Sequence, residues 1–316
     1  GDASMFGSHI HTQYSNITAG LDCINKLGDL VDKAKELGMT GIAITNHDNL
    51  SEVIDINRKQ KQLRKDGDDF VLAIGNEIYL IDQYLQDNGK PMRQRYYHFI
   101  LIAKDKIGYD AIVSLSSRAW YRSEVRFGRR RVPTYKEDIE ELIGKYRGHL
   151  VATTACLGGE LGTSINQGNF EQADQFVEWC LEMFGHDDFY IELQPSERTD
   201  QKKFNEIAAS RYPNVKKLIA TDAHYQNKED FAMFEAFMRS QQESREIQEF
   251  YEFARLMSED EIRGYMKDFP TEFIDECLRH TDEIAAQIEF YDLAQDPKIP
   301  KVDLPELTWD VPTEYL

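Results

Sequence analysis

Short apolar runs alternate with amphipathic helical stretches over roughly the first 225 residues. The run at residues 41–45 (GIAIT) is continuously apolar, which is typical of a strand covered on both faces. Helical stripes closed by glycine, at residues 27–38 and 170–185, separate some of these runs. Strands alternating with helices predict a parallel sheet, and seven such units closing on themselves predict a TIM-like (β/α)7 barrel. The predicted strands are residues 5–11, 41–45, 70–80, 97–103, 149–153, 189–193 and 217–221.

The pattern changes after about residue 225. Residues 231–255 and 259–288 are strongly charged and helical in pattern, and no further strand is indicated. From Asp296 onward, prolines recur among scattered acids, which is typical of an extended connector. The expected organisation is one domain over residues 5–290, composed of a barrel to about 225 and a C-terminal helical extension over 226–290, then a connector over 291–316.

The composition narrows the function classes. Lys and Arg number 37 against 56 Asp and Glu, and the net charge of −19 argues against a general nucleic-acid coat, which needs positive surface. No apolar stretch is long enough to span a bilayer, and the four cysteines form no Cys-x-x-Cys pair. We therefore expect a cytoplasmic protein without a membrane partner. One basic cluster breaks the pattern, as a solvated loop or a phosphate contact: Arg122, Arg126, Arg129, Arg130 and Arg131.

Residues with metal-ligand chemistry stand at the ends of the predicted strands. Side chains alternate faces along a strand, so His9 and His11 point the same way and can hold one cation together. Each residue alone has an ordinary interpretation, such as a small core residue for Cys156. Together they would bury several histidines and carboxylates without partners, which is unfavourable unless cations bind them. The set is His9, His11, His47, Glu77, His98, Cys156, Asp222 and His224.

This ligand mix predicts a cluster of divalent metal ions. Imidazole, carboxylate and one thiolate suit zinc, manganese or iron rather than calcium, and the number of ligands exceeds one tetrahedral site. We expect two or three ions. Clustered divalent ions favour phosphoester hydrolysis by a metal-activated water, without a separate serine or histidine nucleophile. A Walker-type phosphate loop is not indicated, because Gly158-Gly159-Glu160 lacks the Gly-Lys-Ser/Thr ending.

Seven segments carry a family resemblance: residues 9–15 (HIHTQYS), 41–50 (GIAITNHDNL), 75–79 (GNEIY), 97–103 (YHFILIA), 155–160 (ACLGGE), 189–194 (FYIELQ) and 220–225 (ATDAHY). They resemble the polymerase and histidinol phosphatase (PHP) family. Within it, the chain is most similar to the PHP domain at the N-terminus of bacterial or phage C-family DNA polymerases, the DNA polymerase III alpha subunit type. The resemblance covers nearly the whole chain.

The resemblance implies a distorted seven-stranded barrel that binds up to three metals through nine ligands. The eight residues named above fall on eight of these positions. The ninth ligand is usually an acid shortly after the second histidine, which leaves Thr18 or Asp22, and we assign Asp22. A second departure is Asn46, where relatives usually have Asp. Asn46 can still accept a hydrogen bond if this position orients His47.

The resemblance also implies a function. Relatives with a complete ligand set support metal-dependent 3′–5′ exonuclease or phosphoesterase activity, here expected at a DNA 3′ end, with Arg129 and Arg130 as substrate contacts. The remainder of a DNA polymerase is the expected partner, since nothing here matches the paired aspartates of the polymerase core. Two alternatives stay open: a small-molecule phosphatase of the histidinol-phosphatase type, and a non-catalytic, metal-stabilised structural module of the polymerase.

Overall fold

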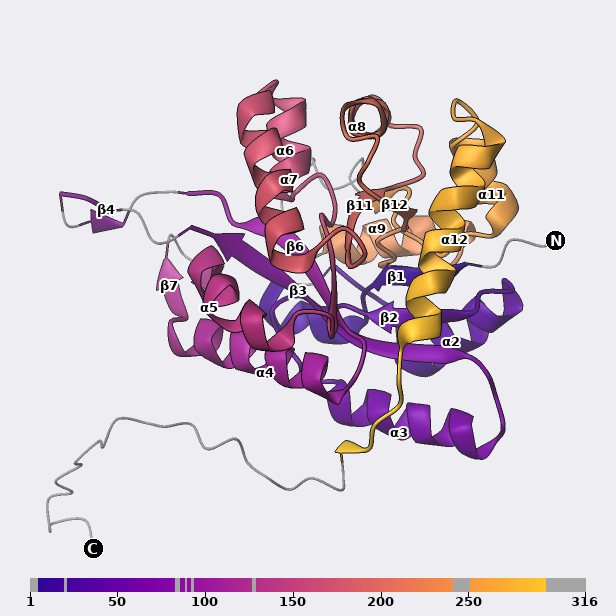
Figure 1. Cartoon of the computed structure of the whole chain (residues 1–316). Helices are drawn as coiled ribbons and strands as arrows, with labels where there is room; N and C mark the ends of the chain where they lie inside the picture. The colour runs from indigo at the N-terminus through magenta and orange to yellow at the C-terminus, as the bar shows by residue number, and fades with distance from the viewer. Residues whose placement is uncertain are drawn as a thin grey trace, which may run out of the picture.

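Seven strands form a sheet that curls into a distorted barrel (Figure 1). The computed structural model describes residues 5–19, 22–82, 86–88, 90–91, 94–126, 129–240 and 251–293. At the open edges, the His11 N–H donates to the carbonyl of Ala223 at 3.0 Å, and the Ala223 N–H donates to the carbonyl of His9 at 3.2 Å. The predicted barrel is therefore confirmed. In sheet order the strands are β1 (Phe6–Ile10), β2 (Gly41–Ile44), β3 (Val71–Ile81), β6 (Tyr97–Ala103), β10 (Leu150–Thr153), β11 (Phe189–Leu193) and β12 (Lys217–Ile219).

The prediction of a wholly parallel sheet is wrong at β6. This strand pairs antiparallel with β3 and with β10, whereas the other neighbours in the barrel are parallel. The described residues between β3 and β6 contain only two short strands, β4 (Gln86–Asp87) and β5 (Lys90–Pro91), and no helix. A parallel neighbour needs a long crossover, usually a helix, whereas an antiparallel one does not. The reversal brings the start of β6 to the barrel end where the other strands finish.

Helices cover the outside of the barrel, with α3 and α4 on one side and α6, α7 and α8 on the other (Figure 1). The two predicted stripes form α2 and α7, and each is followed by a glycine with positive φ, Gly38 at 77° and Gly185 at 80°. Their apolar faces pack into the main hydrophobic core. The helices are α2 (Leu27–Glu36), α3 (Val53–Lys65), α4 (Lys106–Tyr121), α5 (Lys136–Tyr146), α6 (Glu160–Asn166), α7 (Phe170–Phe184) and α8 (Thr199–Arg211), with a short α1 (Asn16–Ala19) after the 3-10 turn η1 (Gln13–Ser15).

The long strand β3 continues past the barrel and supports a basic hairpin. Its last residues pair in parallel with β9 (Pro133–Tyr135). The segment before β9 forms a two-stranded hairpin from β7 (Glu124–Arg126) and β8 (Arg129–Arg131). The arginine cluster of the sequence therefore lies on a hairpin anchored to β3.

A helical extension follows the barrel, made of the 3-10 turn η2 (Lys228–Asp230), α9 (Phe231–Arg239), α11 (Glu259–Tyr265) and α12 (Thr271–Gln287). The helix predicted over residues 231–255 does not reach its expected end, because Arg255 pairs with Tyr225 in a β-bridge instead. Helix α12 packs on the barrel, where the Phe6 N–H donates to Thr281 Oγ1 at 3.0 Å. Most of the predicted connector, residues 294–316, lies outside the described residues.

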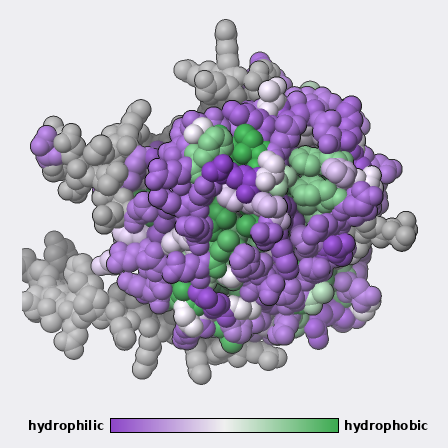
Figure 2. Space-filling model, turned by 45° about the horizontal axis from the view of Figure 1, so that its top comes forward, coloured by the Kyte–Doolittle hydropathy of each residue, from purple (hydrophilic) through white to green (hydrophobic). Residues whose placement is uncertain are grey.

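The face seen in Figure 2 is mainly hydrophilic, and its hydrophobic areas are limited in extent. This agrees with the net charge of −19. Among the described residues, no helix combines the length and the apolar character needed to cross a bilayer.

Candidate metal centre

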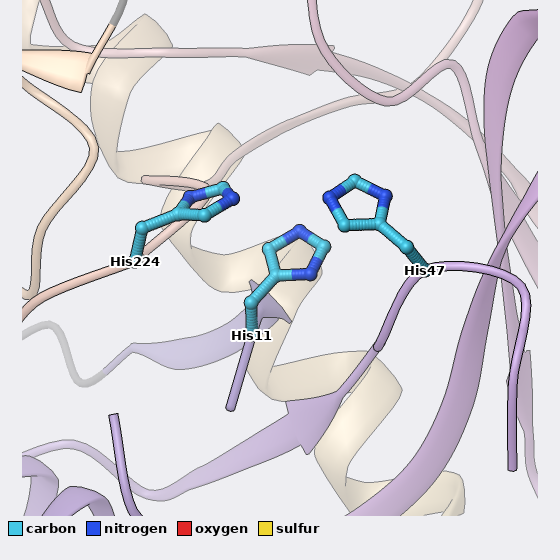
Figure 3. A group of neighbouring side chains, drawn as sticks. All are labelled: His11, His47 and His224. Atoms are coloured by element: carbon cyan, nitrogen blue, oxygen red, sulfur yellow. The ribbon is translucent and has the colours of Figure 1, made fainter. Parts of the chain in front are cut away.

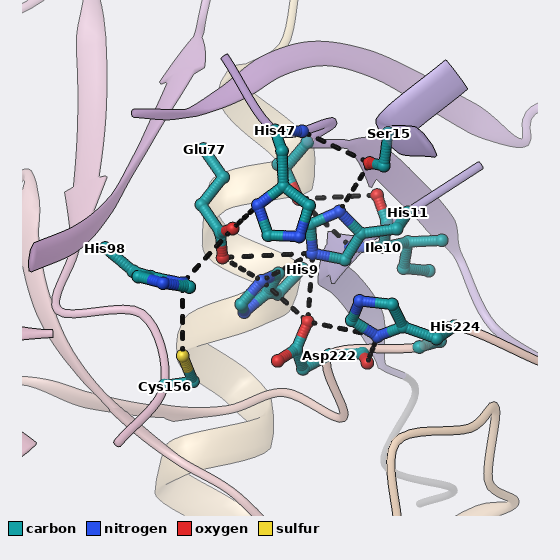
Figure 4. A network of polar contacts seen from close by, with 12 residues as sticks. His9, Ile10, His11, Ser15, His47, Glu77, His98, Cys156, Asp222 and His224 are labelled. Atoms are coloured by element: carbon teal, nitrogen blue, oxygen red, sulfur yellow. Dashed lines mark hydrogen bonds and ion pairs between the residues drawn. The ribbon is translucent and has the colours of Figure 1, made fainter. Parts of the chain in front are cut away.

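All nine candidate ligands lie at one end of the barrel. Figure 4 labels eight of them, and Asp22 lies near His47 and His224. His9 and His11 come from the end of β1 and its following residue, Glu77 lies within β3, and His98 is the second residue of the reversed strand β6. The remaining ligands stand in loops, and each loop follows a strand or the short helix α1. The loop ligands are Asp22, His47, Cys156, Asp222 and His224.

His9, His11, Glu77 and Asp222 form the tightest group. The Nε2 atom of His9 lies 2.9 Å from Glu77 Oε1, 2.9 Å from Asp222 Oδ1 and 3.1 Å from His11 Nε2. His11 Nε2 is also 2.9 Å from Asp222 Oδ1. His9 and His11 thus face the same side of their strand, as the alternation of side chains predicts.

Glu77 links this group to a second one through its other oxygen. Glu77 Oε2 contacts His47 Nδ1 and lies 3.4 Å from His98 Nδ1. His98 Nδ1 is in turn 3.6 Å from the sulfur of Cys156. The two oxygens of Glu77 therefore face two different groups of candidate ligands.

A third group consists of three histidines from three different segments (Figure 3). The His11 ring contacts those of His47 and His224, with centroid distances of 4.3 and 4.4 Å, and the His47 and His224 centroids are 6.1 Å apart. Asp22 Oδ2 lies 3.7 Å from His47 Nε2 and 3.6 Å from His224 Nε2. No hydrogen-bond partner for Asp22 Oδ1 is found within the described part of the chain.

The distances fit metal coordination. Ligand atoms about 2.1 Å from one ion are separated by about 3.0 Å at a right angle and about 3.4 Å at a tetrahedral angle. The 2.9 Å separations around His9 match the first value. The contacts of Asp22 to His47 and His224, at 3.6–3.7 Å, are nearer the second and too long for hydrogen bonds. The donors present therefore fit divalent cations.

The electrostatics of the cluster keep the carboxylates ionised. Burial opposes ionisation of Glu77, but His47 and other nearby histidines outweigh it and hold the pKa of Glu77 well below its usual value. Burial opposes ionisation of Asp222 in the same way, and His9 is the main group that keeps its pKa low. For His11, burial and the neighbouring histidines lower the pKa to about 3, so its imidazole is neutral near pH 7. Ionised carboxylates and a neutral imidazole are the forms that bind metals. His9 differs, because burial lowers its pKa but Asp222 and Glu192 outweigh burial and raise the pKa well above its usual value, so a metal ion would displace a proton from this ring.

Three partners of the ligands were not identified from the sequence. The carboxylate of Glu192 lies 2.7 Å from His9 Nδ1. The hydroxyl of Ser15 lies 2.9 Å from His11 Nδ1, and the hydroxyl of Tyr251 donates to Asp22 Oδ2 at 3.2 Å. Glu192 had a visible signal, an acid inside an otherwise apolar strand. Ser15 and Tyr251 had none, since their partners depend on the tertiary fold.

Asn46 acts differently from expectation. Its Oδ1 accepts hydrogen bonds from the Ser15 hydroxyl at 2.9 Å and from the Thr12 N–H at 2.8 Å. Ser15 Oγ in turn accepts the backbone N–H of His47 at 3.1 Å. Through Ser15, Asn46 is therefore linked to the ring of His11 and to the backbone of His47.

The arginine hairpin is not part of this cluster, and two of the five arginines, Arg122 at the end of α4 and Arg126 in β7, form ion pairs. Arg122 forms a bidentate pair with Asp138, and Arg126 pairs with Glu124. Arg130 is exposed and donates to the hydroxyl of Ser123 at 3.0 Å. The side chain of Arg129 lies outside the part of the structure that can be described.

The fold and the cluster define an α/β-barrel protein with an imidazole, carboxylate and thiolate site at the mouth of the barrel. The chain belongs to the PHP domain family, which it matches over residues 8–196. It is 37% identical over 95% of its length to "Probable DNA polymerase YorL" of Bacillus subtilis and to "DNA-directed DNA polymerase" of Bacillus phage SPbeta. It is 31% identical over 98% of its length to "DNA polymerase III subunit alpha" of Borreliella burgdorferi. The chain spans about a quarter of each relative, 25–26%. The predicted family is confirmed.

Proposed function

We propose that this chain is a metal-dependent phosphoesterase domain that removes nucleotides from DNA 3′ ends, within a DNA polymerase III alpha-like subunit. One observation carries the proposal: seven candidate ligands form three overlapping groups at the mouth of the barrel, and Asp22 and Cys156 lie beside them. Relatives named as DNA polymerases support DNA as the substrate.

Different ligands would bind different metal ions. His9, His11, Glu77 and Asp222 hold one ion, and Glu77 reaches a second group through its other oxygen. When bound, clustered divalent ions activate a water and stabilise the leaving oxygen of a phosphodiester. The chain supplies buried walls around the site, since His9, His11 and Glu77 are at most 1% exposed. Zinc, manganese and iron all suit this donor set.

The proposal includes a path for the DNA substrate and a protein partner. The exposed Arg130, with Arg129 beside it, contacts the phosphates of the DNA strand whose 3′ end enters the barrel mouth. The remainder of the polymerase is the partner, reached through a connector that begins near residue 291, and the protein is cytoplasmic. Free cysteines at all four positions agree with a reducing compartment.

The test is nucleotide release from a 3′-labelled single-stranded oligonucleotide with manganese or zinc. We expect release from the unmodified protein, and its loss after chelation or in His9→Ala. The matched control is His149→Ala, because His149 pairs with Asp105 and is not part of the cluster. Release that persists in His9→Ala or in chelator would refute the proposal. Release of phosphate from histidinol phosphate under the same conditions tests the small-molecule alternative.

A non-catalytic module is the second candidate, and one observation favours it. The ligands come from segments throughout the barrel, from β1 to the loop after β12, so bound ions would cross-link the whole fold. Stoichiometric metal, a large loss of stability on chelation and no hydrolysis of either substrate would support this function instead.

A further inference from the structure

Glu192 is an ionisable residue at the barrel centre that the nine-ligand set leaves out. It lies in β11, its side chain is fully buried, and its Oε2 is 2.7 Å from His9 Nδ1. Burying an ionised carboxylate is unfavourable unless specific donors satisfy it. We therefore expect hydrogen-bond donors around the Glu192 carboxylate, and the structure contains them.

Two side chains donate hydrogen bonds to the carboxylate of Glu192, and a third hydrogen bond fixes its backbone. Thr153 Oγ1 donates to Glu192 Oε1 at 3.2 Å, and Gln194 Nε2 donates to Oε2 at 2.7 Å. The backbone N–H of Glu192 donates to Thr154 Oγ1 at 3.0 Å. The carboxylate retains acceptor capacity beyond these two donors, and the His9 ring presents Nδ1 to its Oε2.

This contact fixes which nitrogen of His9 faces the cluster. If Nδ1–H donates to Glu192, the lone pair of Nε2 points at the space shared with His11, Glu77 and Asp222. A carboxylate behind a ligating histidine sets its tautomer and raises its basicity toward the metal. The contact between Glu192 and His9 would suit a carboxylate–histidine–metal relay, in which His9 Nε2 would hold the ion.

Two other ligating histidines have weaker partners at their second nitrogen. His11 Nδ1 is bonded to the hydroxyl of Ser15 at 2.9 Å, and His224 Nδ1 is bonded to the backbone carbonyl of Asp222 at 2.7 Å. Both partners are neutral groups, whereas the partner of His9 is a carboxyl side chain. An ionised acceptor makes a stronger hydrogen bond than a neutral one.

We propose that Glu192 is a positioning residue that makes the group of His9, His11, Glu77 and Asp222 the highest-affinity metal site, which fills first. The inference rests on the proposed metal-binding function and adds an order of filling to it. The groups containing His98 with Cys156, and His224 with Asp22, then fill at higher metal concentration.

Cobalt(II) is the probe, because its absorption reports coordination and a thiolate-to-cobalt band reports the group beside Cys156. In Glu192→Gln we expect the tightest equivalent of cobalt to weaken by about 10–100-fold, while the midpoint of the thiolate band stays unchanged. Glu192→Asp keeps the carboxylate but shortens the side chain by one methylene. We therefore expect a smaller loss of affinity for the first equivalent of cobalt. This second variant carries the test if Glu192→Gln does not fold.

Asp188→Asn is the matched control. Asp188 is also a buried acid, directly before the same strand, but it pairs with Lys104 rather than with a ligand. It should leave all cobalt equivalents unchanged. The inference is overturned if Glu192→Gln retains the first affinity, or if all equivalents weaken in parallel. The titration contains no DNA and therefore measures metal binding alone. If the unmodified protein binds cobalt but does not hydrolyse DNA, the proposed catalysis is refuted and the inference about Glu192 is not.

Discussion

Asp22→Asn distinguishes the two candidates for the ninth ligand. Asp22 is 6% exposed, and its Oδ2 lies within 3.7 Å of the Nε2 atoms of His47 and His224. Asparagine keeps the shape of the side chain and removes its charge. If Asp22 is a ligand, an ion held by these three side chains loses its only negatively charged donor in that group.

The expected magnitude can be worked through binding linkage. A hundredfold weaker site corresponds to about 2.7 kcal/mol, at about 1.4 kcal/mol per factor of ten. With free metal at about 1,000 times the dissociation constant of the unmodified site, the bound ion stabilises the fold by about 4.1 kcal/mol. At the same metal concentration the variant would keep only about 1.4 kcal/mol, because its site is then filled at about ten times its dissociation constant.

Urea unfolding with excess manganese and with chelator provides the assay. We expect Asp22→Asn to be less stable by about 2.7 kcal/mol with metal, and the difference to vanish or reverse in chelator, where the carboxylate has no ion to bind. Thr18→Ala is the control and should match the unmodified protein in both conditions. The assignment of Asp22 is refuted if its variant keeps the full metal-linked stabilisation and Thr18→Ala loses it.

Three further predictions concern groups around the site and on the surface. Tyr251→Phe removes the donor to Asp22 Oδ2 and should lower the free energy of unfolding by about 1.5 kcal/mol, measured by urea denaturation. Arg130→Ala should weaken single-stranded DNA binding and reduce the slope of log affinity against log salt by about 0.7, measured by fluorescence anisotropy. A hydrogen bond from Arg211 lowers the pKa of Asp174 to about 2, so its stabilisation is complete above about pH 4 and lost as the pH falls toward 2. Asp174→Asn should therefore be slightly destabilising at pH 6, by under about 1 kcal/mol because the pair is exposed, and neutral near pH 2.

The barrel could be predicted from the sequence because each strand is a dense apolar run with clear ends. The predicted runs at residues 189–193 and 97–103 coincide with β11 and β6. The direction of β6 was missed, although the sequence between residues 81 and 97 contains no helical stripe that could serve as a parallel crossover. The apolar pattern of a strand indicates that it is buried. The direction of the strand depends instead on the length and secondary structure of the segment that joins it to the preceding strand.

The candidate site was predictable as far as its ligand types recur at strand ends. Glu77 and His98 illustrate the limit of that rule, since Glu77 lies in the middle of the long strand β3 and His98 near the start of β6. They meet because β3 runs on past the barrel and β6 is reversed. The contact between Tyr251 and Asp22 joins residues 229 positions apart, and no local pattern encodes it.

Backbone strain at the barrel mouth provides independent support for a functional site. Of the four non-glycine residues with positive φ in the described part of the chain, Asp48, Ala155 and Asp222 adjoin or belong to the ligand set. Their φ values are 50–57°, a conformation that is unfavourable for residues other than glycine. Such strain costs about 1–3 kcal/mol per residue and persists only where the surrounding structure enforces it. Each lies two to four residues after the end of a strand, where the chain turns, and Asp222 contacts His9 and His11. A barrel selected for stability alone would have glycine at these turns. The presence of other residues therefore indicates that the placement of side chains at this end was favoured over an unstrained backbone conformation.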